Sequence, residues 1–366
     1  MINKQLICCE LKCLRSCLSG EQMNTDQNKI IILTDGRSGH ETQSLGISTI
    51  LNREQNFDIK FIKIKEISKF KKMFFKFAMN WLSKEWMLGQ LFDLEQFEDL
   101  DLEQVAYIVS AGGATLLPNA VLKSYFTSID VKVKNIIATS LRGMPEGAFD
   151  AVFTIDESKA GNKPYVYYPI APNKLLSFDL ALDEKLAREK LGLSENVGVW
   201  CVLIGADSDE VGIGTVEEWI IMLENLAQQF ASDLFYVSTS RRTSKEFEQS
   251  LKNVLKQYKN IHLILVGEGD KTPIKDLMYA SNMIICSPDS TSMVSESLIL
   301  QKPLLIARFP DSTLSAEFEQ YYQDKINKGW IQFYDQNNFK ITSLNDFKYQ
   351  NHAIKLAEQF NAQLTD

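Results

Sequence analysis

The stretch SNMIICSPDSTSMVSESLILQKPLLIARF, residues 281–309, has the pattern of a strand, a tight turn, a helix and a second strand. The apolar run at 283–286 stops at the Pro-Asp pair 288–289, and the hydroxyl residues 290–292 favour the start of a helix. A second apolar run occupies 303–307. Buried strands that alternate with helices build a parallel sheet covered on both faces. This stretch therefore predicts an α/β fold.

The same alternation occurs in both halves of the chain. Short apolar runs separated by amphipathic stretches fall at 30–34, 59–64, 107–110, 135–139 and 151–155, and again at 199–204, 234–238, 262–266, 283–286 and 304–307. A chain of 366 residues is long enough for two domains. We predict an α/β protein of two Rossmann-like, doubly wound domains facing a cleft, the GT-B-like arrangement. Such a fold leaves the function open.

The domain boundaries are predicted from composition. Two prolines and a charged stretch after them mark a junction, which gives an N-terminal domain at 28–172 and a C-terminal domain at 173–341, followed by a terminal helix within 342–366. Four of the six cysteines lie in the first 17 residues, with no spacing typical of a zinc site. We expect 1–27 to be a disordered leader or a mis-assigned start, with Met23 as the natural first residue.

Charge and hydropathy exclude some classes of protein. The net charge is −8, from 39 Lys and Arg against 47 Asp and Glu, so no nucleic-acid partner is expected. The sequence contains no run of 18 apolar residues, so it predicts no membrane-spanning helix. Cys201 and Cys286 lie in strand-like runs and are expected to be buried, reduced thiols of a cytoplasmic protein.

The first predicted strand ends in the loop DGRSGHE, residues 35–41. Such a loop lies at the carboxyl edge of a parallel sheet, where open α/β folds bind ligands. His40 is one of three histidines, and an imidazole can act as a general base at neutral pH. Asp35 or Glu41 could orient it, and these three residues form the predicted catalytic set.

A helix-capping role is the alternative for this loop. Ser38 would cap the helix and Glu41 would complete a capping box, which explains neither Arg37 nor His40. The spacing of the glycines does not match the dinucleotide-binding pattern G-x-G-x-x-G. The loop residues predicted to contact an acceptor are Gly36, Arg37, Ser38, Gly39 and Gln43.

Two further loops of the first half follow predicted strands. The loop at 110–115 carries Gly112 and Gly113, which either shape an acceptor pocket or allow a helix to pack closely. The loop at 140–143 carries Arg142, which faces either an anionic group of the acceptor or solvent. The sequence leaves both alternatives open.

In the second half, the sequence STSRRT, residues 238–243, follows a predicted strand. Guanidinium groups match phosphate oxygens in bidentate geometry, so Arg241 and Arg242 predict a phosphate site; a solvated turn is the alternative. The neighbouring Ser240 and Thr243 could cap a helix.

The other strand ends of the second half complete a predicted nucleotide site. At residues 288–292 the free N–H groups of a helix start, together with the helix dipole, favour an anion. Glu296 could accept hydrogen bonds from a ribose, and Gly205 would let a ligand approach the backbone. Gly267 and Glu268 follow a strand in a position suited to the base of a nucleotide.

Residues 65–86 carry six lysines and two glutamates. On a helix, two apolar stripes would lie on roughly opposite sides: Phe70, Phe74, Phe77 and Trp81 on one, and Phe75, Met79, Leu82 and Trp86 on the other. We predict an interfacial helix whose second stripe and flanking lysines contact an anionic membrane. The predicted membrane contacts are Lys69, Lys72, Phe75, Lys76 and Trp86. A helix buried on two sides, or packed on another helix, is the alternative.

The motifs DGRSGHETQSLG, STSRRT and SPDSTSMVSES together resemble the elongated-mitochondria family, named after plant mitochondrial fission. The resemblance spans about residues 30–333. Bacterial members resemble GT-B glycosyltransferases, including ones tied to outer-core lipooligosaccharide. The family therefore implies a nucleotide-sugar-dependent transferase, peripheral on the cytoplasmic face of the inner membrane. Nothing in this sequence supports a fission role. The residues that match the family's motifs by position are Ser240, Arg241, Arg242, Asp289, Ser290, Ser292, Met293 and Glu296.

We expect a glycosyltransferase that moves a sugar from a nucleotide-sugar donor to a lipid-linked saccharide acceptor, with no cofactor and with arginines in place of a metal ion. Its sugar, nucleotide and stereochemistry stay open. The alternatives are an epimerase-like enzyme, which would turn over the donor without an acceptor, and a non-catalytic membrane adaptor, whose cellular function would survive loss of nucleotide binding. The predicted donor-binding residues are Gly205, Ser240, Arg241, Arg242, Thr243, Gly267, Glu268, Asp289, Ser290, Ser292, Met293 and Glu296.

Overall fold

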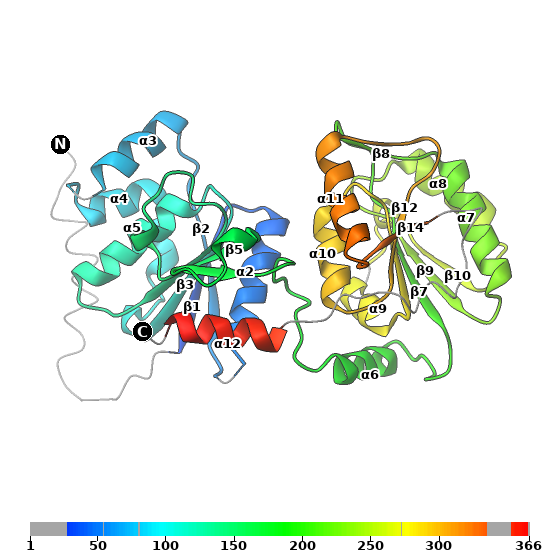
Figure 1. The fold of residues 1–366 in the computed structure, drawn as a ribbon, viewed down its shortest axis with the longest axis horizontal. Helices are drawn as coiled ribbons and strands as arrows, with labels where there is room; N and C mark the ends of the chain where they lie inside the picture. Colours follow the sequence, from blue (N-terminus) through cyan, green and yellow to red (C-terminus); the bar gives the residue numbers. More distant parts are fainter. Residues whose placement is uncertain (1–27, 54, 80, 272, 335–352, 365–366) are drawn as a thin grey trace. The chain divides into compact units, whose positions relative to one another are not determined.

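The computed structural model describes residues 28–53, 55–79, 81–271, 273–334 and 353–364. The chain divides into two compact units (Figure 1). The first comprises the described residues up to Lys174 together with those from Lys355 onward, and the second runs from Leu175 to Ile354. The predicted leader, 1–27, lies outside the described residues.

The first unit is built on a six-stranded parallel sheet in the order β2-β1-β3-β4-β5-β6. Residues 30–33 of the central strand β1 are almost completely buried, as expected of a strand covered by helices on both faces. The strands are β1 (Lys29–Thr34), β2 (Asp58–Lys63), β3 (Val105–Ala111), β4 (Lys134–Ala138), β5 (Ala151–Thr154) and β6 (Tyr165–Tyr167). The helices are α2 (Ser38–Leu51), α3 (Lys69–Ala78), α4 (Lys84–Leu91), α5 (Leu116–Ser128) and α12 (Ala353–Leu364).

Helix α12 returns the end of the chain to the first unit (Figure 1). Its Phe360 is fully buried, with its ring 5.0 Å from the ring of Phe153 on β5. The helix lies within 342–366, the range predicted for a terminal helix; residues 342–352, 365 and 366 of that range are outside the described residues.

The second unit repeats the plan with the strand order β10-β9-β7-β11-β12-β14, all parallel. Its strands are β7 (Val199–Leu203), β9 (Leu234–Ser238), β10 (Ile261–Ile264), β11 (Met283–Cys286), β12 (Leu304–Ala307) and β14 (Gln332–Tyr334), and an antiparallel pair joins β8 (Val211–Ile213) to β13 (Ser312–Leu314). Its helices are α6 (Leu180–Lys190), α7 (Val216–Gln229), α8 (Lys245–Leu255), α9 (Ile274–Ala280), α10 (Thr291–Ile299) and α11 (Ala316–Asn327).

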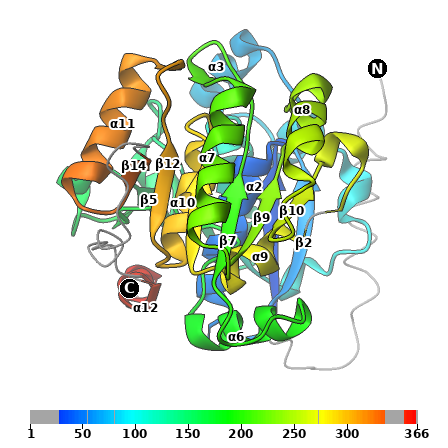
Figure 2. The ribbon, with the colours of Figure 1, turned by 90° about the vertical axis from the view of Figure 1, so that its right-hand side faces the viewer.

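Successive side chains of β7 point to opposite faces of the sheet, and both faces are buried. Trp200 and Val202 pack with Leu223 of α7 and Leu251 of α8, which lie next to each other in front of the sheet in Figure 2. Short 3₁₀ turns complete the described structure at Leu94–Phe97, Leu102–Gln104, Glu146–Ala148, Glu157–Lys159 and Val266–Glu268.

These two sheets confirm the predicted α/β class with two doubly wound units. The structure adds the strands β6, β8, β13 and β14, which the sequence did not indicate. Each is three residues long, which is too short to show a hydrophobic period.

The single helix predicted for residues 65–86 is wrong. The chain forms two helices, because Ser83 caps a new one: its side chain accepts a hydrogen bond from the backbone N–H of Trp86, at the start of α4. Phe75 was assigned to the membrane-facing stripe, yet it is only 1% exposed, and its ring lies 5.5 Å from that of Trp86. The exposed stripe is the other one, which comprises Phe70, Phe74, Phe77 and Trp81.

Candidate functional site

In the first sheet, the strand order reverses between β1 and β3, which is where doubly wound sheets bind ligands at their carboxyl edge. The register pairs Leu33 of β1 with Ser110 of β3, so the two strands end at nearly the same level. The loops that follow β1, β3 and β4 carry the residues predicted for catalysis and acceptor binding.

The centre of this edge is a pair of side chains, Asp35 and His40. Nδ1 of His40 lies 3.0 Å from each carboxylate oxygen of Asp35. The Asp35 side chain is 9% exposed and that of His40 is 26% exposed. A carboxylate at Nδ1 holds the ring proton there, which leaves Nε2 as the nitrogen able to accept a proton. The geometry is that of a general base oriented by an aspartate.

Glu41 has a different partner from the one suggested by the sequence. Its carboxylate accepts a hydrogen bond of 2.6 Å from Oγ1 of Thr34, at the end of β1. Ser38 is the first residue of α2, and the N-cap residue Arg37 forms no side-chain cap hydrogen bond. The capping-box alternative is therefore wrong, since neither Ser38 nor Glu41 caps the helix.

The other residues of this loop lie around the Asp35–His40 pair. Gly36 has φ +80°, and its N–H donates to Oγ1 of Thr34 over 2.9 Å. The exposed Arg37 has its Nε 3.9 Å from Asp35. Gly39 lies in the first turn of α2, and Gln43, in its second turn, is half-buried.

The two glycines after β3 make room for the side chains of His40 and Arg142. A Cβ on Gly112 would lie 2.7 Å or closer to three atoms of the His40 ring, and its φ is +86°. A Cβ on Gly113 would lie 2.5 Å from the guanidinium carbon of Arg142. The Arg142 side chain is therefore directed over the turn that follows β3, and Lys76 of α3 donates to the Arg142 carbonyl over 3.0 Å. His40 and Arg142 thus lie over two neighbouring residues, Gly112 and Gly113.

Gly112→Ala should therefore displace the imidazole. The added methyl group occupies the position of the ring, and the left-handed backbone conformation disfavours any residue with a Cβ. A shift of about 1 Å in a catalytic group can lower a rate by roughly 10², and we expect a loss of that order in turnover. Gly147→Ala is the control, because a Cβ there meets nothing within 4 Å. Full activity of Gly112→Ala would show that the position of His40 does not matter.

The second sheet has the same kind of switch point, between β7 and β11. The register pairs Leu203 of β7 with both Ser238 of β9 and Cys286 of β11, so three loops meet at this edge. The backbone N–H of Gly205 donates to Oγ of Ser287 over 2.8 Å. A Cβ on Gly205 would overlap the carboxylate of Asp289.

The two adjacent arginines have different environments. Arg242 donates to Oδ2 of Asp289 over 2.5 Å, and the Asp289 side chain is fully buried. Ser287 donates to the other carboxylate oxygen over 2.5 Å. Arg241 is exposed and, within the described part of the chain, forms no ion pair or side-chain hydrogen bond. Arg241 is therefore the guanidinium that remains available to an anion.

Ser240 and Thr243 fold the arginine turn without capping a helix. The N-cap of α8 is Ser244, which corrects the capping role suggested for both residues. Oγ1 of Thr243 donates to the carbonyl of Gly205 over 2.6 Å, and the N–H of Arg242 donates to Oγ of Ser240 over 3.1 Å. These bonds fasten the turn to the loop after β7.

Helix α10 begins at the same edge. Ser290 is its N-cap and accepts a hydrogen bond of 3.3 Å from the N–H of Met293. Ser292 is exposed, and Met293 and Glu296 are half-buried. The first N–H groups of a helix have no partner within the helix, so this end offers donors to an anion.

The loop after β10 is held by a residue that the sequence did not single out. Glu248 of α8 is 1% exposed and accepts hydrogen bonds from Thr239 and from the N–H of Gly267. Glu268, predicted to bind the donor, forms a surface ion pair with Lys252 at 2.7 Å. Nothing in the local pattern marks Glu248, because a glutamate in the first turn of a helix is common.

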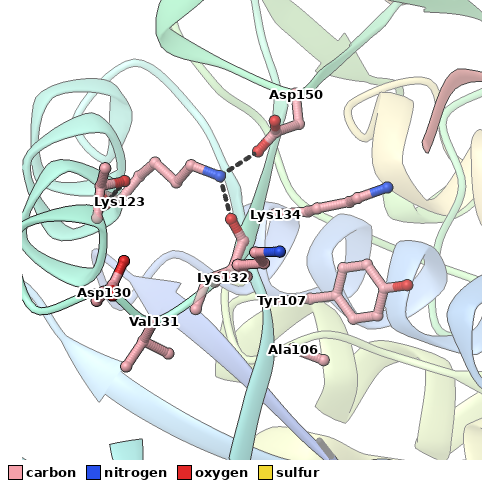
Figure 3. A pocket seen from close by; sticks show the side chains of 10 residues that line it. Ala106, Tyr107, Lys123, Asp130, Val131, Lys132, Lys134 and Asp150 are labelled. Carbon is pink, nitrogen blue, oxygen red and sulfur yellow. Dashed lines mark hydrogen bonds and ion pairs between the residues drawn. The ribbon is translucent and has the colours of Figure 1, made fainter. Parts of the chain in front are cut away.

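A cavity among the described residues lies away from both strand edges discussed above (Figure 3). It measures about 380 Å³ and is bounded by residues at the amino ends of β3 and β4, including Tyr107 and Lys134. At its rim, Nζ of Lys123 lies 2.9 Å from Oδ2 of Asp150 and also donates to the carbonyl of Val133. The cavity is at the opposite edge of the first sheet from His40, so it is not part of the candidate site.

Other chemical features of the described residues are limited. No group of three or more His, Cys, Asp or Glu side chains there could hold a metal ion, and no helix there is long and apolar enough to cross a bilayer. Asp207 and Asp209 have D-x-D spacing, but Oδ1 of Asp207 accepts from the N–H of Ile213 at 2.8 Å. Cys201 and Cys286 are buried free thiols, and burial raises the pKa of Cys286 to about 12.

Comparison with known proteins gives a family and several similar folds. The family model described as Mitochondrial fission ELM1 matches residues 38–359. No curated protein matches the chain. Among solved structures, the chain resembles UDP-GlcNAc 2-epimerase from Methanocaldococcus jannaschii, with 13% identity, 92% of each chain covered and a TM-score of 0.48. It also resembles the ADP-heptose LPS heptosyltransferase II of E. coli, with 13% identity, 92% of this chain and 98% of that chain covered, and a TM-score of 0.44.

Proposed function

The chain belongs to the mitochondrial fission ELM1 family, and from this premise we propose that it is a metal-independent glycosyltransferase of GT-B type. It moves a sugar from a nucleotide-sugar donor to a lipid-linked saccharide acceptor at the cytoplasmic surface of a membrane. The observation that carries the proposal is the Asp35–His40 pair at the switch point of the first sheet. A base in that position suits a hydroxyl that must lose a proton as it attacks.

The first unit binds the acceptor in this mechanism. Nε2 of His40 accepts the proton of the acceptor hydroxyl as the oxygen bonds to the anomeric carbon of the sugar. The Asp35 carboxylate stabilises the imidazolium that forms, because it lies 3.0 Å from Nδ1. Arg142, directed over Gly113, attracts an anionic group of the acceptor.

The second unit binds the donor. The bond between the anomeric carbon and the nucleotide oxygen breaks, and negative charge grows on the departing phosphate. Arg241 and the N-terminal N–H groups of α10 stabilise that charge, since both lie at the carboxyl edge of the second sheet. Arg242 holds the arginine turn to Asp289, Glu296 binds the ribose, and the loop at Gly267 contacts the base.

Arg241→Ala should weaken nucleotide binding by about 1.5–3 kcal/mol, the usual worth of a hydrogen bond to a charged group. The side chain is exposed, so the melting midpoint without ligand should not change. Titration calorimetry with a nucleoside diphosphate measures the first quantity and a thermal melt the second.

Arg242→Ala is the matched comparison. It removes the ion-pair partner of the buried Asp289, so it should lower the stability of the unliganded protein by about 1–3 kcal/mol. If Arg241→Ala kept full nucleotide affinity, the phosphate would bind elsewhere.

The reaction class is tested with a panel of UDP-, GDP-, ADP- and CMP-sugars. A glycosyltransferase should release nucleotide from the sugar donor only when a lipid-linked saccharide is present. Conversion of the donor sugar without any acceptor would identify an epimerase-like enzyme instead. A variant that cannot bind nucleotide but retains its cellular function would identify an adaptor.

A further inference from the structure

Helix α3 carries an exposed apolar surface. Five large side chains along α3 and the turn after it are between 49% and 80% exposed. We call them the α3 aromatic face: Phe70, Met73, Phe74, Phe77 and Trp81. Phe77 and Trp81 pack edge to face with their rings 5.8 Å apart. Contiguous apolar surface of this kind marks an interaction site.

The charge around this face is positive. Between Glu66 and Glu85 the chain has no acidic residue and five lysines, although its net charge is −8. The lysines are Lys69, Lys71, Lys72, Lys76 and Lys84. Exposed aromatic side chains flanked by lysines are typical of a helix that lies in the interface of an anionic membrane. A symmetric contact with a second copy would bring like charges together, which disfavours that occupant.

A short series of contacts joins this helix to the candidate acceptor site within the first unit. Lys76 donates to the carbonyl of Arg142, and the Arg142 guanidinium lies over Gly113. The adjacent Gly112 contacts the ring of His40. Helix α3 also follows β2, whose carboxyl end is at the same edge of the sheet as the His40 loop.

We propose that the α3 aromatic face inserts into an anionic lipid bilayer and brings Arg142 and His40 to the level of the lipid headgroups. The acceptor would then reach His40 without leaving the membrane. The statement about the acceptor rests on the proposed function, whereas the insertion of the α3 aromatic face into a bilayer does not. Helices of this kind bury their apolar face by about 5–10 Å, which is enough for the side chains of one helical face.

The first test is sedimentation of the purified full chain with phosphatidylcholine vesicles that contain or lack phosphatidylglycerol. We expect binding only to the anionic vesicles. Combined Phe70→Ala, Phe77→Ala and Trp81→Ala substitutions should weaken that binding at least tenfold. Combined Leu182→Ala and Leu186→Ala is the matched control, because these α6 side chains are each 51% exposed but lie in the second unit. The control should bind like the unchanged protein.

The second test concerns charge. Lys69→Gln with Lys72→Gln should weaken binding about fivefold per lysine, which corresponds to about 1 kcal/mol each. Lys256→Gln with Lys259→Gln removes the same charge from exposed positions of the second unit and should have little effect. Equal effects of the two pairs would overturn the proposal, since binding would then follow net charge alone.

Two other results would also overturn it. One is unchanged vesicle binding by the triple alanine variant. The other is an absence of vesicle binding together with a concentration-dependent dimer that the triple variant abolishes, which would assign the face to a second copy. Because the vesicle assay contains no nucleotide sugar, its outcome is separate from that of the transfer reaction. A protein that binds vesicles without transferring sugar would refute the proposed function but not the proposed insertion of the α3 aromatic face.

Discussion

Replacing His40 by alanine should lower sugar transfer by about 10²–10⁴-fold, the usual contribution of a positioned general base. Nucleotide affinity should stay nearly the same, because His40 belongs to the first unit and the predicted phosphate ligands belong to the second. The loss of transfer follows from the geometry of the Asp35–His40 pair. The Asp35 carboxylate lies 3.0 Å from Nδ1 of His40, which leaves Nε2 to accept the proton of the acceptor hydroxyl. Steady-state transfer rates and calorimetric titration measure the two quantities.

His262→Ala is the control for His40→Ala. This histidine is exposed on the edge strand β10, stacked on Tyr236, and no step of the mechanism uses it. Its variant should transfer sugar at the rate of the unchanged protein. A fully active His40→Ala would place the base elsewhere. A His40→Ala variant that loses nucleotide affinity as much as Arg241→Ala would contradict the assignment of acceptor and donor to separate units.

Phe75→Ala should lower the free energy of unfolding of the first unit by about 3–5 kcal/mol, as expected for a large buried aromatic side chain. Phe75 is 1% exposed and packs with Met87, Leu88 and Trp86 in the core beneath α3 and α4. Phe77→Ala, two residues away, removes a side chain that is 76% exposed and should change stability by less than about 0.5 kcal/mol.

Urea unfolding followed by circular dichroism measures both Phe variants. The difference between them determines which face of α3 belongs to the core. If the two substitutions destabilised the protein equally, the α3 aromatic face would be packed against protein rather than available to a bilayer.

The fold was predictable because its central strands are continuous apolar runs. Residues 199–203 are buried on both faces of a sheet, so every position in the strand is apolar and the pattern is clear in the sequence. The positions of the candidate loops were also predictable, since loops that follow parallel strands lie at the carboxyl edge of the sheet, where such folds bind ligands. Residues 35–41 and 238–243 were singled out for that reason.

The contacts within each site were not predictable in the same way. Arg242 and Asp289 are 47 residues apart, and they meet only because β9, β7 and β11 are neighbours in the sheet. The role of Gly112 depends likewise on β1 and β3 being adjacent. Strand order follows from the packing of the whole unit, which a local pattern does not contain.

The error at α3 has a different physical cause. A hydrophobic period of 3.6 residues identifies apolar stripes on a helix but does not say which stripe faces the core. Here both stripes are aromatic, and the lysines between them flank both. Packing of α3 against α4 and α5 determines which stripe is buried, and it buries Phe75 rather than Phe77.

The central claim is that the second unit binds the nucleotide of a sugar donor, and a thermal melt in the presence of nucleotides tests it most directly. A nucleotide at 100 times its dissociation constant should stabilise the folded protein by about 2.7 kcal/mol and raise the melting midpoint. The same nucleotide should raise the midpoint of Arg241→Ala less, because that variant binds it more weakly. If no UDP, GDP, ADP or CMP species moves the midpoint of the unchanged protein, the second unit is not a nucleotide site and the account is wrong.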